Sequence, residues 1–207
     1  MRTHRIAVIP GDGIGVDVIA EGRRVLDAAA QADGEFRLEY QEFPWSCRYY
    51  AEHGRMAPRD FLAILRDFEA IYLGAVGYPG VPDHVSLWEL LLPIRKSFNQ
   101  YVNLRPVRLL AGVTSPLVGR GPRDIDFVCV RENTEGEYAG VGGRVQTGTP
   151  AEVAVQSGVF TRLGVERIID YAFELARNRK RKKVTSATKS NALNYSMVFW
   201  DEVFAEV

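Results

Sequence analysis

Apolar and polar residues form two different patterns along the first hundred positions. A short apolar run at residues 6–9 ends at Pro10, which predicts a buried strand followed by a turn. From Ile14 onward, apolar residues recur every three or four positions, the spacing of a helix that buries one face. Together the patterns predict strands at 6–9, 36–43 and 70–73 and helices at 14–29 and 57–68. This order is typical of an α/β fold with a mostly parallel sheet.

The pattern changes near residue 100. Residues 86–98 predict a helix that contains Pro93, whose ring costs about 3 kcal/mol inside a helix or forces a kink. Beyond this point the patterns predict strands at 101–110, 124–132, 138–148, 152–160 and 182–187, and helices at 163–177 and from 194 onward. We therefore expect a domain boundary between 1–100 and 101–207. The last helix keeps an apolar stripe up to Val207, which suggests a truncated chain or a partner segment elsewhere.

Composition narrows the class of protein. The 207 residues are 46% hydrophobic and 25% charged, as in globular proteins. Lys and Arg together number 26, as do Asp and Glu, and this zero net charge argues against a general nucleic-acid or membrane-surface binder. Two cysteines, Cys47 and Cys129, make no disulfide framework, and no apolar stretch reaches the length of a membrane span. We expect a cytoplasmic protein.

The glycine-rich stretch Gly11-Asp12-Gly13-Ile14-Gly15 allows two interpretations. It follows a predicted strand and opens a predicted helix, as a dinucleotide-binding loop does. However, the spacing is G-x-G-x-G rather than G-x-G-x-x-G. A tight strand-to-helix turn, in which the glycines supply unusual backbone angles, is the favoured alternative.

Three arginines stand near the ends of predicted elements, namely Arg95, Arg105 and Arg131. In such positions, arginines can point into a shared cleft and grip carboxylates through two parallel hydrogen bonds. Pairing with surface acids is the alternative, and for a single arginine it is the more common one.

Two further residues are candidates for proton transfer. Tyr138 follows the acidic run Glu132, Glu135 and Glu137, and Lys189 lies in TSATKSN, just after a predicted strand. A partly desolvated lysine near other cations can lose its proton and act as a base, although a surface lysine is the simpler interpretation. The three histidines show no metal-ligand spacing, so we assign no metal ligand.

Four motifs taken in order resemble one family, the β-decarboxylating 2-hydroxyacid dehydrogenases that include the isocitrate and isopropylmalate enzymes. They are IAVIPGDGIG, IRKSFNQYVNLRPVR, VRENTEGEYAGVGG and TSATKSN. Within the family, WSCRYYAEHG, GYPGVPDHVSLW and DIDFVCVRENTEGEY look most like the members that act on tartrate and D-malate. The resemblance covers the whole chain.

The resemblance implies a two-domain α/β fold unlike the classical Rossmann domain. Residues 1–100 would begin a large α/β domain, and residues 101–207 would begin a small domain with an intersubunit β arm. The active site would lie in the cleft between domains of a homodimer, with residues shared across the interface. The implied cofactors are NAD and Mg²⁺ or Mn²⁺, with K⁺ as a further candidate. The family's metal aspartates and adenosine-binding loop lie outside this sequence.

The same resemblance implies roles for the candidate residues. Arg95, Arg105 and Arg131 match the arginines that hold the substrate's carboxylates. Tyr138 matches the tyrosine that protonates the enolate after carbon dioxide leaves. Lys189 matches the lysine, donated by the neighbouring subunit, that takes the proton from the 2-hydroxyl group.

Five positions match the family's cofactor cleft. Asn191 matches the asparagine near the nicotinamide amide, and the cleft is lined by residues equivalent to Ile14, Ala75, Val76 and Gly77.

One position bears on the choice of substrate. Trp88 lies seven residues before Arg95, where isopropylmalate enzymes carry a glutamate and isocitrate enzymes a serine. A tryptophan would fill that space and leave room for a four-carbon diacid, D-malate or tartrate. Pro93 is unexpected in this helix and would shift Arg95. The alternatives are a non-catalytic remnant and an isopropylmalate- or isocitrate-type fragment, and we expect the 207-residue chain alone to be inactive.

Overall fold

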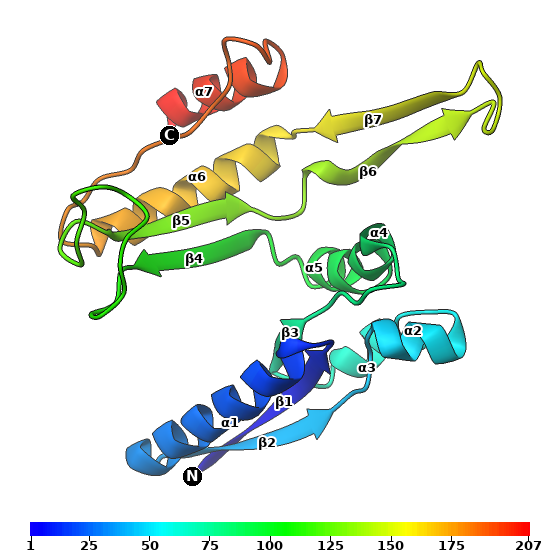
Figure 1. The fold of residues 1–207 in the computed structure, drawn as a ribbon. Coiled ribbons are helices and arrows are strands. Elements are labelled where there is room, and N and C mark those ends of the chain that lie inside the picture. Colours follow the sequence, from blue (N-terminus) through cyan, green and yellow to red (C-terminus); the bar gives the residue numbers. More distant parts are fainter. The chain divides into compact units, whose positions relative to one another are not determined.

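The computed structural model describes residues 1–207 and divides them into two compact units, Met1–Ser97 and Phe98–Val207. Each unit has its own strands and helices (Figure 1), and each is described by itself.

The first unit is built on a three-stranded parallel sheet in the order β2-β1-β3. Its strands are β1 (Arg2–Gly11), β2 (Phe36–Glu42) and β3 (Ala70–Ala75). β1 is central because its residues Ala7, Val8 and Ile9 are fully buried, as the apolar run predicted. The predicted parallel α/β organisation of this part of the chain is confirmed.

Helices complete the first unit. They are α1 (Ile14–Asp33), α2 (Cys47–His53), α3 (Phe61–Leu65), α4 (Asp83–Ser86) and α5 (Leu92–Ser97), with the π-helical turn η1 (Leu87–Leu91) between the last two. The helix predicted at 57–68 is wrong in length, because only α3 is helical. One turn is enough to bury both Phe61 and Leu65, and the amides of Asp67 and Phe68 then bond carbonyls three residues back.

Pro93 is accommodated by a wide turn. The helix predicted at 86–98 starts earlier, at Asp83, and widens into η1 immediately before the proline. The amide of Leu92 bonds the carbonyl of Leu87, five residues back. A proline in a regular helix would clash with the carbonyl four residues before it, and a single π turn relieves that clash.

The wide turn shifts the register of the helix by one residue. Trp88 and Lys96 are eight positions apart and would differ by about 80° around a regular helix. In the structure the Lys96 Nζ atom nevertheless lies over the Trp88 ring, 5.2 Å from its centroid. The extra residue in η1 therefore places Trp88 and Lys96 on the same side of this segment.

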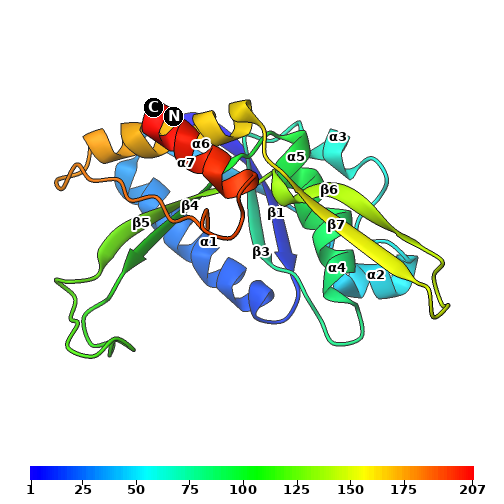
Figure 2. The same cartoon turned by 90° about the horizontal axis from the view of Figure 1, so that it is seen from above.

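The second unit contains two antiparallel hairpins and two helices. They are β4 (Val102–Arg108) with β5 (Asp126–Glu132), β6 (Gly136–Val145) with β7 (Val153–Val159), α6 (Arg162–Arg177) and α7 (Ser196–Glu206). The core consists of Val165, Ile168 and Ile169 of α6 with Val203 of α7, and one face of β4–β5 packs against it. The far half of the β6–β7 hairpin runs away from α6 and α7 as an extended arm (Figures 1 and 2).

The strand predicted at 182–187 is wrong. No strand lies between α6 and α7, and these residues form an irregular segment. A strand needs a neighbour to bond its amides and carbonyls, and neither hairpin extends to this segment. Instead, Ser186 Oγ accepts a hydrogen bond of 2.9 Å from the indole nitrogen of Trp200 in α7.

Candidate active site

The turn after β1 packs tightly against the end of β3. The amide of Asp12 donates to the carbonyl of Ala75 at 2.7 Å. A Cβ at Gly15 would lie 2.3 Å from the carbonyl oxygen of Pro10 and 2.6 Å from the amide of Ala75, so only glycine fits. Gly15 thus permits a tight strand-to-helix turn, as the favoured alternative for this stretch predicted. The turn brings Ile14, which is 65% exposed, close in the fold to the loop that begins at Ala75.

Asp12 makes contacts beside the predicted cofactor loop, and its sequence position gave it no role. Its side chain is buried, and its carboxylate accepts hydrogen bonds from the amides of Cys47 (3.0 Å), Arg48 (3.3 Å) and Gly77 (3.2 Å). It thereby fastens the 75–77 loop and the start of α2 to the glycine-rich turn. The sequence signal was an aspartate between two glycines, which is typical of a solvent-exposed turn.

The two remaining candidates of the first unit lie on the segment formed by η1 and α5. Trp88 is 39% exposed, and Arg95 is half-buried. The wide turn before Pro93 separates the two in the sequence, as described above. The role of Trp88 in bounding a substrate pocket stays a prediction.

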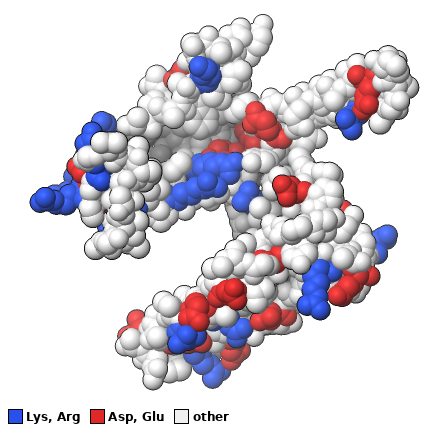
Figure 3. All heavy atoms as spheres, in the orientation of Figure 1, with Lys and Arg blue, Asp and Glu red and all other residues white.

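Two arginines of the second unit share one face of the β4–β5 sheet. Asn103 pairs with Arg131 and Arg105 pairs with Cys129, so all four side chains project from the same side. Arg105 Nε donates to Asn103 Oδ1 at 3.2 Å. Basic side chains gather over this region of the surface (Figure 3). The opposite face, which carries Val130, packs on α6.

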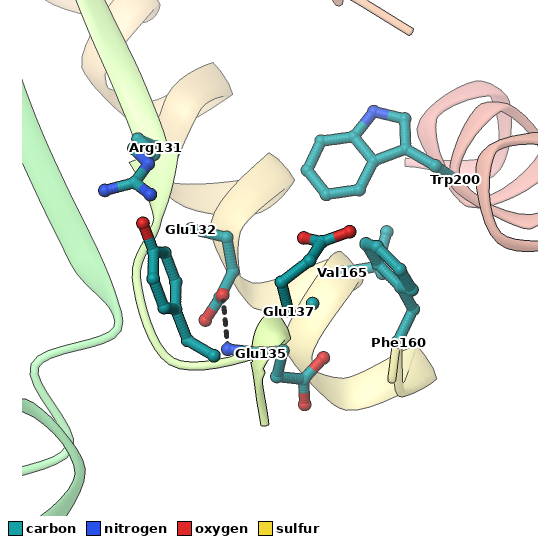
Figure 4. A pocket seen from close by; sticks show the side chains of 9 residues that line it. Arg131, Glu132, Glu135, Glu137, Phe160, Val165 and Trp200 are labelled. Carbon is teal, nitrogen blue, oxygen red and sulfur yellow. Dashed lines mark hydrogen bonds between the residues drawn. The ribbon is translucent and has the colours of Figure 1, made fainter. Parts of the chain in front are cut away.

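Arg131 also meets Tyr138. The Arg131 guanidinium carbon lies over the Tyr138 ring, 5.1 Å from its centroid. Beside this pair lies a cavity of about 160 Å³ (Figure 4). Its lining includes both residues with Glu132, Glu137, Phe160 and Trp200. The structure therefore brings together an arginine and the tyrosine that the sequence analysis had singled out separately.

Most of the acidic run beside Tyr138 is structural. Glu132 accepts from the backbone amides of Thr134 (2.9 Å) and Glu135 (2.8 Å), closing the turn between β5 and β6 (Figure 4). Glu135 accepts from both the amide (2.9 Å) and the hydroxyl (2.6 Å) of Thr161, which caps α6. These carboxylates hold the backbone that presents Tyr138.

Lys189 and Asn191 lie apart from this cluster. Both are exposed on the irregular segment between α6 and α7, and neither has a hydrogen bond to Arg131 or Tyr138. The carbonyl of Lys189 accepts from the amides of Ala192 (3.0 Å) and Leu193 (2.9 Å), which forms a local turn. The role of Lys189 as a base donated by a neighbouring subunit stays a prediction.

No three His, Cys, Asp or Glu side chains of residues 1–207 form a group that could hold a metal ion. None of the helices is both long and apolar enough to cross a membrane.

Comparison with known proteins decides the family. The sequence pattern described as Isocitrate/isopropylmalate dehydrogenase matches residues 5–207. The chain belongs to this family. It is 60% identical over 204 residues to "D-malate dehydrogenase [decarboxylating]" of Escherichia coli, covering 98% of this chain and 56% of that protein. It is 56% identical over 203 residues to "Tartrate dehydrogenase/decarboxylase" of Pseudomonas putida, covering 97% and 55%.

The isocitrate/isopropylmalate dehydrogenase fold is confirmed by a solved structure. The isocitrate dehydrogenase from Methylococcus capsulatus superposes with a TM-score of 0.78 at 30% identity, over 98% of this chain and 56% of that one. This chain spans little more than half the length of the relatives it matches.

Proposed function

We propose that this chain serves the NAD-dependent oxidation and β-decarboxylation of a four-carbon 2-hydroxy diacid, D-malate or tartrate. The names of the relatives at 60% and 56% identity support this substrate class. The observation that carries the proposal is the shared face of Arg105 and Arg131, with Arg131 lying over the ring of Tyr138.

The arginines bind the diacid. Arg105 and Arg131 present two guanidinium groups from one sheet face, and a guanidinium matches a carboxylate through paired hydrogen bonds. The family resemblance gives Arg95 the same role of binding a substrate carboxylate. Charge-assisted hydrogen bonds are worth about 1.5–3 kcal/mol each, and they fix the orientation of the reacting carbon atoms.

Two side chains move protons. Lys189, contributed by the partner subunit of a homodimer, takes the proton from the 2-hydroxyl group as C2 is oxidised. The bond between C3 and the departing carboxylate then breaks, its electron pair forms an enolate, and Tyr138 protonates C3. The Arg131 guanidinium, which lies over the Tyr138 ring, holds this ring next to the arginine that binds the substrate.

The chain carries candidate residues for NAD but not for the divalent metal ion. NAD, when bound, accepts the hydride from C2, and Ile14, Ala75, Val76, Gly77 and Asn191 are the residues that would line its nicotinamide end. The exposed Ile14 beside a loop of small residues fits that role. The side chains of residues 1–207 do not themselves form a divalent-metal site, and the family resemblance places the aspartates that would hold Mg²⁺ or Mn²⁺ outside this sequence.

A chimera tests the proposal. Residues 1–207 replace the matching stretch of the E. coli D-malate dehydrogenase, and NADH formation is followed with D-malate, tartrate, isocitrate and 3-isopropylmalate in the presence of Mn²⁺ and K⁺. We expect turnover with D-malate or tartrate that Tyr138→Phe reduces at least about a hundredfold. The isolated 207-residue chain should form no NADH. A folded chimera that oxidises neither four-carbon diacid, or that prefers the larger substrates, would contradict the proposal.

The same chimera tests the role of Trp88. Trp88→Ser should raise kcat/KM for alkyl-substituted malates relative to D-malate by about tenfold, because it opens space beside the substrate. Trp88→Phe, which keeps most of the bulk, is the matched control. An unchanged ratio would contradict the role of Trp88 in bounding the substrate pocket.

A further inference from the structure

The carboxylate of Asp12 connects three separate parts of the first unit. It follows β1 in the chain, and its two oxygens accept from Cys47 and Arg48 at the start of α2 and from Gly77 after β3. The residue is only 6% exposed. A buried carboxylate costs several kcal/mol unless hydrogen bonds satisfy it, and these three backbone donors supply that compensation.

The thiol of Cys47 extends this connection to the loop. Cys47 is 1% exposed, and its thiol hydrogen-bonds to the Asp12 carboxylate while the backbone amides of Gly77 and Tyr78 bond its sulfur. Burial, followed by the hydrogen bond and the negative charge of Asp12, raises the pKa of the Cys47 thiol to about 11. The thiol therefore stays protonated near neutral pH and remains a donor to Asp12.

Beyond the end of β3 at Ala75, side-chain packing holds the 75–78 loop only in part. Ala75 and Gly77 are exposed, Tyr78 is 59% exposed, and a Cβ added at Gly77 would meet no atom within 4 Å. Val76 is half-buried, whereas the side of the loop at Gly77 and Tyr78 gains little from packing and depends on hydrogen bonds. The loop is held by hydrogen bonds from its backbone amides and by the carbonyl of Ala75, which accepts a hydrogen bond from the Asp12 amide.

We propose that Asp12 and Cys47 are positioning residues that hold the 75–78 loop in place for the nicotinamide end of NAD. The proposal rests on the proposed function insofar as it concerns the cofactor. Asp12 acts through the backbone of the loop, with Cys47 as a second hydrogen-bonding group between the same partners. Neither residue contacts the reacting atoms.

Amide hydrogen exchange of the 207-residue chain tests the positioning without any activity. Asp12→Asn keeps the shape but replaces one acceptor oxygen with a donor that faces a backbone N–H. We expect amide exchange in residues 76–78 to accelerate about tenfold, equivalent to about 1.4 kcal/mol. Asp17→Asn, at an exposed carboxylate in the first turn of α1, is the matched control and should change nothing.

Cysteine variants give a second test that does not depend on the folding of Asp12→Asn. Cys47→Ala should accelerate exchange of the same amides about threefold, and Cys47→Ser, which keeps a donor and an acceptor, should restore most of the protection. Cys129→Ser, at an exposed cysteine, is the control. Unchanged exchange in the loop, or exchange that accelerates equally in all three strands, would overturn the positioning role.

The cofactor part is tested separately in the chimera described above. Asp12→Asn should raise KM for NAD about fivefold while kcat and KM for D-malate change less than about twofold, because the loop and not the arginines is displaced. Faster exchange of the loop with an unchanged KM for NAD would overturn the cofactor role of the loop and leave the positioning by Asp12 intact. A chimera without any dehydrogenase activity would count against the proposed function alone.

Discussion

Two loops that carry predicted site residues are held in very different ways. The turn at 11–15 and the loop after β3 are joined by a buried carboxylate and by backbone bonds, and glycine at 15 permits their close approach. The segment at 184–191, which carries Lys189 and Asn191, has one side-chain hydrogen bond, from Trp200 to Ser186, and a local backbone turn. One loop is preformed within its unit, whereas the other is exposed.

The difference fits the proposed roles. The 75–78 loop would act through the position of its backbone, which must be fixed before the cofactor arrives. Lys189 would act on a substrate bound by the partner subunit, so contacts across the dimer can complete its position. We therefore expect damage to the first loop to reduce stability and damage to the second to reduce activity.

Loss of Lys189 should have the largest effect. In the chimera, Lys189→Met should lower kcat about 10²- to 10⁴-fold because it removes the proposed base, while the melting temperature stays within about 1 °C. Lys183→Met, at an exposed lysine of the same segment, is the control and should leave kcat unchanged. Activity retained by Lys189→Met would show that this segment does not supply the base, and it would contradict the proposed difference between the two loops.

Loss of space at Gly15 should have the next largest effect, this time on stability. Gly15→Ala places a methyl group 2.3 Å from the carbonyl oxygen of Pro10 and should lower the free energy of unfolding by about 2–3 kcal/mol. Gly143→Ala in β6 is the control, because a Cβ there meets no atom within 4 Å and the residue has no positive φ. It should change the free energy of unfolding by less than about 0.5 kcal/mol. Urea unfolding of the 207-residue chain measures both, and equal losses would contradict a tightly packed turn.

Sequence periodicity was sufficient for the elements that bury one face. β1 and α6 were predicted because their apolar spacing records which side faces a core, and the structure has both. The motifs also identified Arg105, Arg131 and Tyr138. Their proximity was less visible, because it depends on the strand register of β4 and β5 and on the turn that leads into β6.

Features that depend on neighbours were missed. The segment at 182–187 has the composition of a strand but no partner to pair with in this chain. Asp12 looks like a solvated turn residue until the amides of Gly77 and Cys47, 65 and 35 positions away, are found on its carboxylate. The π-helical turn before Pro93 was also missed, because the sequence predicted only that the proline would kink a helix.

Removal of the Trp200 indole should have a smaller effect, confined to the exposed segment. Trp200→Phe deletes the donor to Ser186 and should lower the free energy of unfolding by about 1 kcal/mol. Trypsin should also cut faster at Lys189. Ser186→Ala removes the acceptor, and a double-mutant cycle isolates the bond. Strictly additive losses would show that this hydrogen bond does not hold the segment.

The smallest effect concerns the helix that carries Trp200. Arg162 of α6 bonds Glu206 of α7, and this hydrogen bond, with the arginine's charge, holds the pKa of Glu206 below its usual range. A depressed folded-state pKa adds stability above the unfolded-state pKa, and that stability is lost as the pH falls through the folded-state value. Wild type should therefore melt slightly above Glu206→Gln at about pH 7, and the difference should shrink steadily as the pH falls below the usual glutamate pKa. Asp201→Asn, on the same helix, controls for net charge. A difference that persists at acid pH would show that the Glu206 carboxylate does not join α7 to α6 through its charge.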